Sequence, residues 1–374
     1  MRIIIFIFVL ILVFASLHYY VHKRFVEKAY LRRSIKRAFN IFLILNFLGV
    51  LAYALTRYYP FIPNWLYFVF SLPIGIIFLM FCWTLIYDAF NKTLSLPQIS
   101  QSKRDFFRKS LDIISVGALF GLNIKAVSEA QHIVFEDVDI KIKNLKKQYS
   151  IVQLSDIHIG GLIDAGFIKS IVSKINASEP DLVVITGDLV DIEIKYARSA
   201  LNELASLKSK YGTYFIVGNH EYFHDIAEIL KTVKSLGIKV LENDSVYIGE
   251  KDSGFNLAGV YDMFGYRTLE FVPDLKKALK HTLAISPTVL LAHQPLYIQE
   301  VENKNVDLML SGHTHGGQLY PFRLLVKMQQ PYIAGLYNHN DRLQIYVNRG
   351  TGYWGPPMRL GVSSEITNIK LLPS

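Results

Sequence analysis

The chain has 374 residues, of which 51% are hydrophobic and 19% are charged, and its mean hydropathy is +0.26. This length suits one large domain with an appendage, because single domains commonly run to about 100 to 200 residues. The apolar residues concentrate in about the first 125 positions. This composition argues against a wholly soluble chain and predicts that the appendage lies in lipid.

The net charge of +9 is unevenly distributed. Residues 1–110 hold 14 Lys and Arg against 3 Asp and Glu, whereas the remaining chain holds 26 against 28. The excess is therefore a membrane-topology signal, and a nucleic-acid partner is disfavoured. The lone cysteine, Cys82, can form no intrachain disulfide.

Three stretches are long and apolar enough to cross a hydrocarbon core of about 30 Å, which needs about 20 helical residues. They are residues 3–20, 41–57 and 65–87. The first stretch resembles the core of a signal peptide, but it lacks a clear small-residue cleavage site, and other apolar segments follow it. We expect it to be retained as a helix.

The loops between these stretches predict their orientation. Residues 22–37 are dense in Lys and Arg, whereas the loop before the third stretch carries only Arg57. The positive-inside rule places the basic loop in the cytoplasm and the amino terminus outside. The chain then returns to the cytoplasm after Tyr87, where four more Lys and Arg residues follow between positions 103 and 109.

Residues 111–130 leave two topologies open, because Asp112 and Lys125 interrupt a short apolar core. If this segment spans, the following domain lies outside the cytoplasm. If it is an amphipathic helix on the inner surface, the domain stays inside. The preceding sequence SKRDFFRKS (102–110) resembles a twin-arginine export signal with Lys103 in place of the first arginine, which favours crossing. We therefore expect three to four transmembrane helices within residues 1–130.

From Tyr149 onward, short β-branched runs alternate with helical stretches, which is typical of an α/β sandwich. Residues 167–177 and 226–236 are predicted helices. Residues 131–147 are predicted to be a linker, and residues 148–374 a catalytic domain. The predicted strands are 149–154, 181–186, 213–218, 288–293, 306–312 and 343–347.

Five polar clusters lie at or just after the ends of predicted strands, where α/β proteins place their sites. They are SDIH (155–158), TGDLVD (186–191), GNHE (218–221), AHQ (292–294) and SGHTHGGQ (311–318). Residues two apart in an extended segment point the same way, so Asp156 and His158 can reach one ion, and His313 and His315 can both point inward.

The side chains in these clusters suit a pair of divalent ions. Carboxylate, imidazole and carboxamide ligands without a thiolate are compatible with Mn, Fe, Zn or Mg. Two cations about 3.5 to 4 Å apart need a bridging anion, and Asp188 is a natural candidate because of its place between the first and third clusters. Any one cluster arises often by chance, but five in this order predict a metal centre.

The ordered motifs D-x-H, G-D-x-x-D, G-N-H-E, H and G-H-x-H resemble those of the calcineurin-like metallophosphoesterase superfamily, over about residues 148–374. The resemblance implies a four-layer α/β/β/α sandwich and two divalent metal ions. It also implies that His220 is the catalytic histidine, oriented by Asp191. The implied ligands are Asp156, His158, Asp188 and His315 for one metal, and Asp188, Asn219, His293 and His313 for the other.

Two further stretches, GHTHGGQLYPF (312–322) and NRGTGYWGPPMRLGVSSEI (348–366), resemble the bacterial membrane-associated branch of YkuE-like and YaeI-like phosphoesterases and the transmembrane proteins with a metallophosphoesterase domain. This branch is distantly linked to the UDP-2,3-diacylglucosamine hydrolases of lipid A biosynthesis. The aromatic and proline residues at 353–357 can either pack the domain or form a wall for substrate. Arg359 is a candidate phosphate contact, with a salt bridge to a carboxylate as the alternative.

These observations predict a multi-pass protein of the bacterial inner membrane whose catalytic domain lies outside the cytoplasm. Its expected reaction is hydrolysis of a phosphoester or pyrophosphate bond by hydroxide generated at two metal ions, with the lipid bilayer as partner and a lipid-linked or nucleotide-sugar-lipid substrate. His220 is expected to protonate the leaving oxygen. The alternative is a catalytically inert phosphoesterase-like module of a membrane sensor or transport protein.

Overall fold

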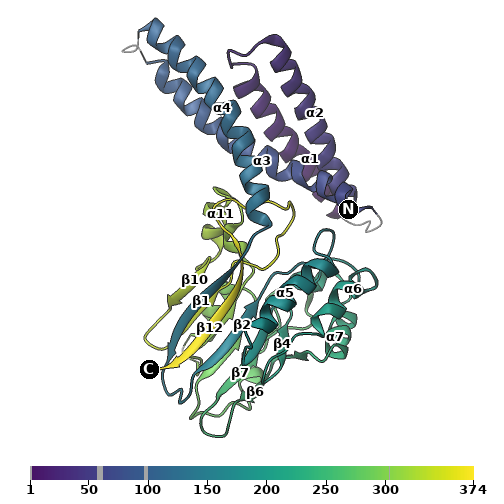
Figure 1. Ribbon diagram of the computed structural model, residues 1–374, viewed down its shortest axis with the longest axis vertical. Helices are drawn as coiled ribbons and strands as arrows, with labels where there is room; N and C mark the ends of the chain where they lie inside the picture. Colours follow the sequence, from purple (N-terminus) through teal and green to yellow (C-terminus); the bar gives the residue numbers. More distant parts are fainter. Residues whose placement is uncertain (1, 57–61, 97–99, 303) are drawn as a thin grey trace. The chain divides into compact units, whose positions relative to one another are not determined.

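A computed structural model describes residues 2–56, 62–96, 100–302 and 304–374 of the protein, and it divides into two compact units (Figure 1). The first, here called the helical unit, consists of Met1–Glu129 and Gly355–Leu360. The second, the sheet domain, consists of Ala130–Trp354 and Gly361–Ser374. The short segment Gly355–Leu360 thus belongs to the helical unit, although the sequence predicted one unbroken catalytic domain from residue 148.

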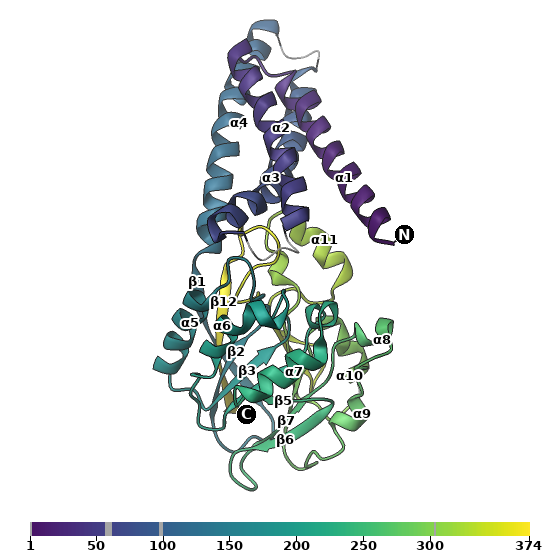
Figure 2. The ribbon, with the colours of Figure 1, turned by 90° about the vertical axis from the view of Figure 1, so that its right-hand side faces the viewer.

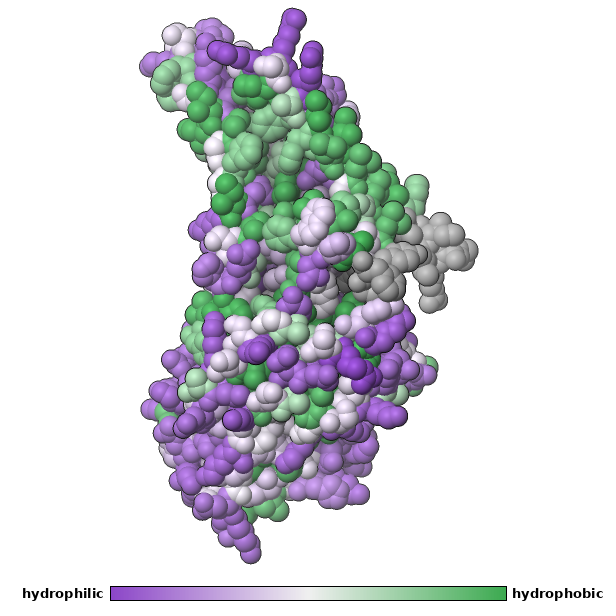
Figure 3. Space-filling model, turned by 45° about the vertical axis from the view of Figure 1, so that its right-hand side comes forward, coloured by the Kyte–Doolittle hydropathy of each residue, from purple (hydrophilic) through white to green (hydrophobic). Residues whose placement is uncertain are grey.

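Among its described residues, the helical unit contains four long helices that are long and apolar enough to cross a membrane. They are α1 (Arg2–Val21), which continues into a turn of π-helix at His22–Val26, α2 (Arg33–Thr56), α3 (Asn64–Leu94) and α4 (Gln101–Ala130). Large apolar side chains on all four are exposed, and Figure 3 shows the resulting hydrophobic surface. A surface of this kind is stable in lipid and not in water.

The fourth helix begins ten residues earlier than the predicted span at 111–130. Asp112, which interrupts its apolar face, is buried within the helical unit. Its carboxylate accepts hydrogen bonds from the Tyr87 hydroxyl and the Tyr30 backbone N–H, both at 2.7 Å. An ionisable side chain in a membrane helix is costly unless it is paired in this way, so Asp112 is compatible with a spanning α4.

The sheet domain is built on two six-stranded mixed sheets, and several strand neighbours within each sheet are parallel. The first sheet has the order β1 (Ile133–Ile142), β12 (Ser364–Pro373), β2 (Tyr149–Leu154), β3 (Leu182–Thr186), β4 (Thr213–Ile216) and β5 (Lys239–Val240). The second has the order β10 (Gly335–Asn338), β11 (Gln344–Val347), β9 (Leu308–Ser311), β8 (Thr288–Leu291), β7 (Phe255–Gly259) and β6 (Asp244–Ile248).

Alternating side chains of the strands build the layers between these sheets and helices. In β3, Val183 and Ile185 pack in one core cluster with the helices α5 (Ala165–Ala177), α6 (Ile194–Leu204) and α7 (Ile226–Ser235), which lie side by side in Figure 2. Leu182 and Val184 point the other way, into the core between the two sheets. This is the period-two alternation expected of a strand buried on both faces.

A third core cluster lies on the outer face of the second sheet. Leu290 of β8 and Met309 of β9 pack there with Ala278 of α9 (Leu275–Ala278) and with residues of α10 (Ile298–Val301). The order of layers is therefore helices, sheet, sheet, helices, which confirms the predicted α/β/β/α sandwich. Two short helices, α8 (Gly265–Thr268) and α11 (Phe322–Gln329), complete the domain.

The predicted linker at 131–147 is wrong for most of its length, because Ile133–Ile142 forms the edge strand β1. β1 pairs in parallel with β12 from Ile133 opposite Ser364 to Ile142 opposite Pro373. Asp137, Asp139 and Lys141 are exposed, and only Ile140 and Ile142 of this strand are buried. The alternation of Val138, Ile140 and Ile142 with Asp137, Asp139 and Lys141 is the period-two signal that could have revealed this strand.

Candidate metal centre

The polar clusters predicted from the sequence come together at the carboxyl ends of five strands. Their loops follow β2, β3 and β4 of the first sheet and β8 and β9 of the second. Within each sheet these strands are neighbours and parallel, so their carboxyl ends share one edge. Side chains far apart in sequence thereby meet at one point.

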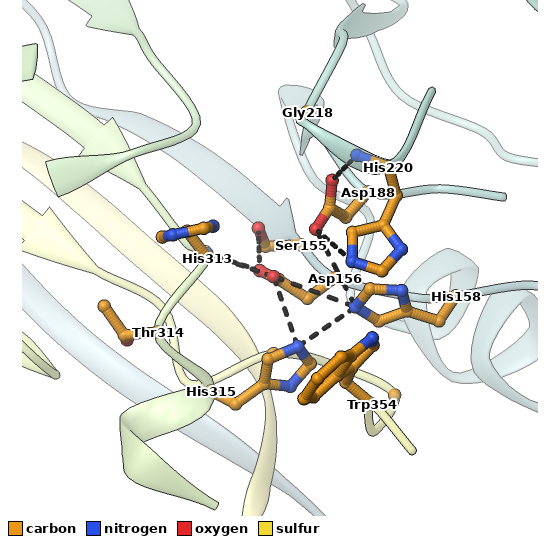
Figure 4. Close-up of polar contacts among 12 residues, drawn as sticks. Ser155, Asp156, His158, Asp188, Gly218, His220, His313, Thr314, His315 and Trp354 are labelled. Carbon is orange, nitrogen blue, oxygen red and sulfur yellow. Dashed lines mark hydrogen bonds and ion pairs between the residues drawn. The ribbon is translucent and has the colours of Figure 1, made fainter. Parts of the chain in front are cut away.

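Among the residues that the structure describes, three groups of side chains could hold a metal ion, and two of them consist entirely of predicted ligands. Figure 4 shows Asp156, His158 and His315 of one group, with Asp188 and His313 of the other. In the first group, His315 Nε2 is 3.0 Å from His158 Nε2 and 3.4 Å from Asp156 Oδ1. The second group consists of Asp188, His293 and His313. Asp188 Oδ2 lies 3.2 Å from His293 Nε2 and 3.9 Å from His158 Nε2, as a ligand shared by both groups would.

The hydrogen bonds of His293 fit a cation in the second group. Its Nδ1 lies 2.7 Å from the Thr186 carbonyl oxygen, which can only accept, so Nδ1 carries the proton of the neutral ring. In the neutral ring the Nε2 lone pair faces Asp188 Oδ2 and Asn219 Oδ1, each at 3.2 Å. Asp188 raises the pKa of His293 well above its usual value, which favours a positive charge at this position. Lone pairs aimed at one another in a buried site need either a second proton or a metal ion between them.

In the first group, too, a histidine lone pair faces a neighbouring candidate ligand. His158 Nδ1 lies 2.8 Å from Asp191 Oδ1, which assigns its proton to Nδ1 and leaves the Nε2 lone pair facing His315. Burial and the neighbouring His293 lower the pKa of His313 to about 3, so that ring is also neutral and able to bind a metal. The donor set fits the mixed oxygen and nitrogen coordination of divalent transition metals or magnesium.

Backbone conformation at the site is strained where the ligands are. Five of the ligand residues have a left-handed φ, between 49° and 69°, which is uncommon for residues other than glycine. They are Asp156, His158, Asp188, His313 and His315. Such strain persists only where the surroundings enforce it, and it concentrates at functional sites. Glycines allow the close packing: a Cβ on Gly312 would lie 1.9 Å from Ser155 Oγ.

His220 and Asp191 form a further pair beside the two groups. His220 Nδ1 lies 2.7 Å from Asp191 Oδ1, and its Nε2 lies 3.8 Å from Asp188 Oδ2. Burial alone would lower the pKa of His220, but Asp188 and Asp191 outweigh it and raise this pKa to about 9. The ring is therefore positively charged at neutral pH and presents Nε2–H toward the shared carboxylate.

Comparison with known proteins agrees with this geometry. The calcineurin-like phosphoesterase family matches residues 149–317. A Helicobacter pylori protein named as an uncharacterized metallophosphoesterase is 38% identical over 345 residues, which are 92% of this chain and 92% of that relative. The chain belongs to the calcineurin-like metallophosphoesterase family. Membership confirms the resemblance seen in the motifs and implies a phosphoric ester hydrolase.

Two other metallophosphoesterases extend the match to the branch predicted from the sequence. A transmembrane protein with metallophosphoesterase domain from Danio rerio is 34% identical over 329 residues, covering 83% of this chain and 74% of the relative. The uncharacterized metallophosphoesterase YkuE of Bacillus subtilis is 30% identical over 285 residues, covering 72% of this chain and 97% of the relative. The first of these names agrees with the four candidate spans found here.

Glu221 has a structural role in this metallophosphoesterase that the sequence did not reveal. It is fully buried, and its carboxylate accepts backbone hydrogen bonds from Asp188 and Gly218 on Oε2 and from Leu189 and Val190 on Oε1. One side chain thus joins the loops after β3 and β4. Its place in the GNHE motif was the available signal, but its partners are main-chain groups, which no motif displays.

Asp191 also does more than the sequence predicted. The same oxygen, Oδ1, contacts both His158 and His220. Burial favours the neutral form of Asp191, but these two imidazoles hold its pKa well below the usual range. Asp191 therefore orients one candidate metal ligand as well as the candidate catalytic histidine.

The aromatic and proline segment is divided between the two units. Trp354 belongs to the sheet domain, is 44% exposed and has its ring centroid 6.3 Å from that of His220. Gln318 holds its main chain on both sides, donating to the Trp354 carbonyl and accepting from its N–H. Pro356 and Pro357 are buried and belong to the helical unit. Trp354 therefore lies beside the candidate catalytic histidine, whereas Tyr353 packs against the core cluster of the first sheet.

Arg359, predicted as a phosphate contact, lies in the segment of the chain that belongs to the helical unit. Its side chain is fully buried, and its backbone N–H donates to the Ala126 carbonyl of α4 at 2.8 Å. The sequence could not foresee this, because the contact joins residues more than 200 positions apart.

Proposed function

We propose that the protein is a membrane-anchored hydrolase of phosphoester or pyrophosphate bonds that uses two divalent metal ions. The observation that supports this proposal is the pair of buried ligand groups sharing Asp188, with histidine lone pairs aimed at carboxylate and carboxamide oxygens. Asp156, His158, Asp188 and His315 would hold one ion. Asp188, Asn219, His293 and His313 would hold the other.

The protein's own residues would divide the remaining work. When bound, the two cations would neutralise charge on the phosphate oxygens and make water acidic enough to supply the nucleophile. His220, held through Nδ1 by Asp191, would present its Nε2–H to the leaving oxygen and protonate it. Trp354 beside His220 offers an aromatic face to the organic part of the substrate.

An amphiphilic substrate suits this site better than a nucleic acid. The sheet domain carries no excess of basic residues, and a protein that grips a polyphosphate backbone needs one. A tethered domain meets lipid-borne substrates at high local concentration. We therefore infer a lipid-linked phosphoester or pyrophosphate, of the kind cleaved by UDP-2,3-diacylglucosamine hydrolases.

The test compares two aspartates of similar backbone conformation in the full chain reconstituted in nanodiscs. Asp188 is buried with φ 50°, whereas Asp252 is exposed with φ 66°. With Mn²⁺ present, Asp188→Asn should lower hydrolysis of bis-p-nitrophenyl phosphate by at least about a hundredfold, since even outer residues of metal sites cost 10–100-fold. Asp252→Asn should leave it unchanged. Metal uptake by the wild type without hydrolysis of this diester, p-nitrophenyl phosphate or UDP-2,3-diacylglucosamine would instead support an inert binding module.

We further propose that the protein is a multi-pass protein of the bacterial inner membrane whose sheet domain lies outside the cytoplasm. With a cytoplasmic basic loop after the first helix, four spans return the chain to the outer side. The test fuses alkaline phosphatase or green fluorescent protein after Ser374. Phosphatase activity without fluorescence is expected, and fluorescence alone would place the domain in the cytoplasm.

A further inference from the structure

The helix α11, Phe322–Gln329, has its apolar residues on the wrong side for a helix that packs on a protein core. Leu324, Leu325 and Met328 are 60%, 54% and 82% exposed, and no residue of this helix is buried. In α5 of the same domain, by contrast, Ile168 and Ile171 are buried against the sheet. A surface helix normally turns its apolar stripe inward.

Arg323 of α11 lies on the opposite side. At 100° per residue, Leu324, Leu325 and Met328 fall within one arc of about 100°, Arg323 lies across from it, and Lys327 lies at its edge. Arg323 is half-buried, and its Nη1 donates to the Gly316 carbonyl at 3.0 Å. The side of the helix that carries Arg323 therefore holds it to the domain, and the apolar face points away from the domain.

The helix α11 is attached to the turn that carries the candidate metal ligand His315. Gly316 follows His315, and a Cβ on Gly317 would lie 2.5 Å from Arg323 Cα, so the helix packs tightly on the turn that carries this ligand. Tyr320, in the connection between the turn and the helix, is 44% exposed, and Arg323 lies over its ring at 5.8 Å. Whatever covers α11 is therefore held close to the turn that carries His315.

We propose that the apolar face of α11 inserts into the lipid bilayer as an interfacial helix. Eight residues make a helix of about 12 Å, too short to cross a hydrocarbon core of about 30 Å but long enough to lie in the headgroup region. The bilayer is always within reach, because the same chain carries four candidate spans. Lys327, exposed at the edge of the apolar face, complements anionic headgroups.

This contact would place the turn bearing His315 at the lipid surface, where the polar group of a membrane-borne substrate is found. The inference goes beyond the proposed hydrolysis, because membrane contact of α11 needs no chemistry. It depends on the exposed leucines and methionine and on the tether. A membrane-contact result and an activity result are consequently independent of each other.

The experiment measures lipid contact at one labelled position in the full chain. In a Cys82→Ala background, which removes the only cysteine, Met328→Cys is labelled with an environment-sensitive NBD fluorophore and reconstituted into vesicles of phosphatidylglycerol and phosphatidylcholine. Ile285→Cys is the matched control, because Ile285 is 75% exposed in the same domain. A cooperative thermal unfolding transition close to that of the unlabelled protein verifies that both labelled proteins are folded.

The proposal predicts that lipids with a doxyl group near the headgroup quench the label at position 328 by at least twofold, and that aqueous iodide quenches it weakly. The label at position 285 should show the reverse. Two results would overturn the proposal. Strong iodide quenching at position 328 would mean that α11 faces water. Blue-shifted emission that neither quencher reduces would mean that protein covers it, either the helical unit or a second copy.

Discussion

At the residue scale, Asp191 and His220 have separable roles. The Nδ1 atom of His220 contacts Asp191, which is not one of the proposed metal ligands. The Nε2 atom of His220 is therefore the one available to a substrate. We expect His220→Ala to lower turnover by about 10²- to 10⁴-fold, as is typical for loss of a general acid. Two metal ions per chain should still be found by plasma mass spectrometry. Loss of the metals would contradict the assigned role.

Asp191→Asn should behave differently, because the oxygen that it alters contacts both His220 and His158. An amide in this place removes the charge that orients the imidazole of a candidate ligand. Metal affinity should therefore fall by about 10- to 100-fold in addition to turnover. Titration of the metal-free variant with Mn²⁺ measures this change, and an affinity equal to that of His220→Ala would refute the double role.

Glu221 supports the loops rather than the chemistry. Glu221→Gln replaces one carboxylate oxygen by an NH₂ group, which leaves two of the four backbone N–H donors without an acceptor. Each unsatisfied buried donor costs about 1 to 3 kcal/mol. The melting temperature should fall by at least about 5 °C, at about 2–4 °C per kcal/mol. Glu228→Gln, at an exposed position, should change it by about 1–2 °C at most.

The site residues were predictable to different degrees for physical reasons. Asp156, His158, Asp188, Asn219, His293, His313 and His315 follow apolar strands in a fixed order, and parallel strands bring such residues to one edge. The role of Glu221 was not predictable, because main-chain donors carry no sequence signature. The placement of Arg359 was not predictable either, because it depends on a contact with α4.

At the element scale, β1 shows how a strand is missed and how its contribution is tested. Ile140 is fully buried between the sheets, whereas Val134 in the same strand is 40% exposed. If β1 is part of the folded core, Ile140→Ala should lower the free energy of unfolding by about 2 to 4 kcal/mol. Val134→Ala should cost less than about 1 kcal/mol. Equal small effects, measured by thermal unfolding, would mean that residues 133–142 behave as a linker.

The central strands were predicted because their sequences are clear apolar runs. β2, β3, β8 and β9 are buried on both faces, so they are nearly continuous apolar runs bounded by polar clusters. α4 was predicted only in part. Its first turns are charged, and the burial of Asp112 depends on Tyr87 and Tyr30, which belong to other parts of the helical unit.

At the scale of the whole molecule, metal binding should stabilise the fold. Asp156 and Asp188 are both buried, and burial raises the pKa of Asp156, so their charges need a counterion. Mn²⁺ at a hundred times its dissociation constant should stabilise the chelator-treated protein by about 2.7 kcal/mol. This corresponds to a rise of about 5 to 10 °C in melting temperature. Asp188→Asn should remove most of that rise, and an equal rise in both proteins would show that the ions bind elsewhere.

The assignment of Gly355–Leu360 to the helical unit has a practical consequence for anyone who wants a soluble fragment. Cutting the chain before Ala130 removes the helices but keeps this segment, in which Met358 and Arg359 are fully buried in the intact protein. Met358 packs against Gly75, and the main chain of Arg359 bonds to Ala126, so both would lose their cover. A single deletion therefore leaves residues exposed that are normally buried, and the resulting fragment should aggregate. A fragment that stays monodisperse needs a second edit that replaces residues 355–360 with a short polar bridge from Trp354 to Gly361.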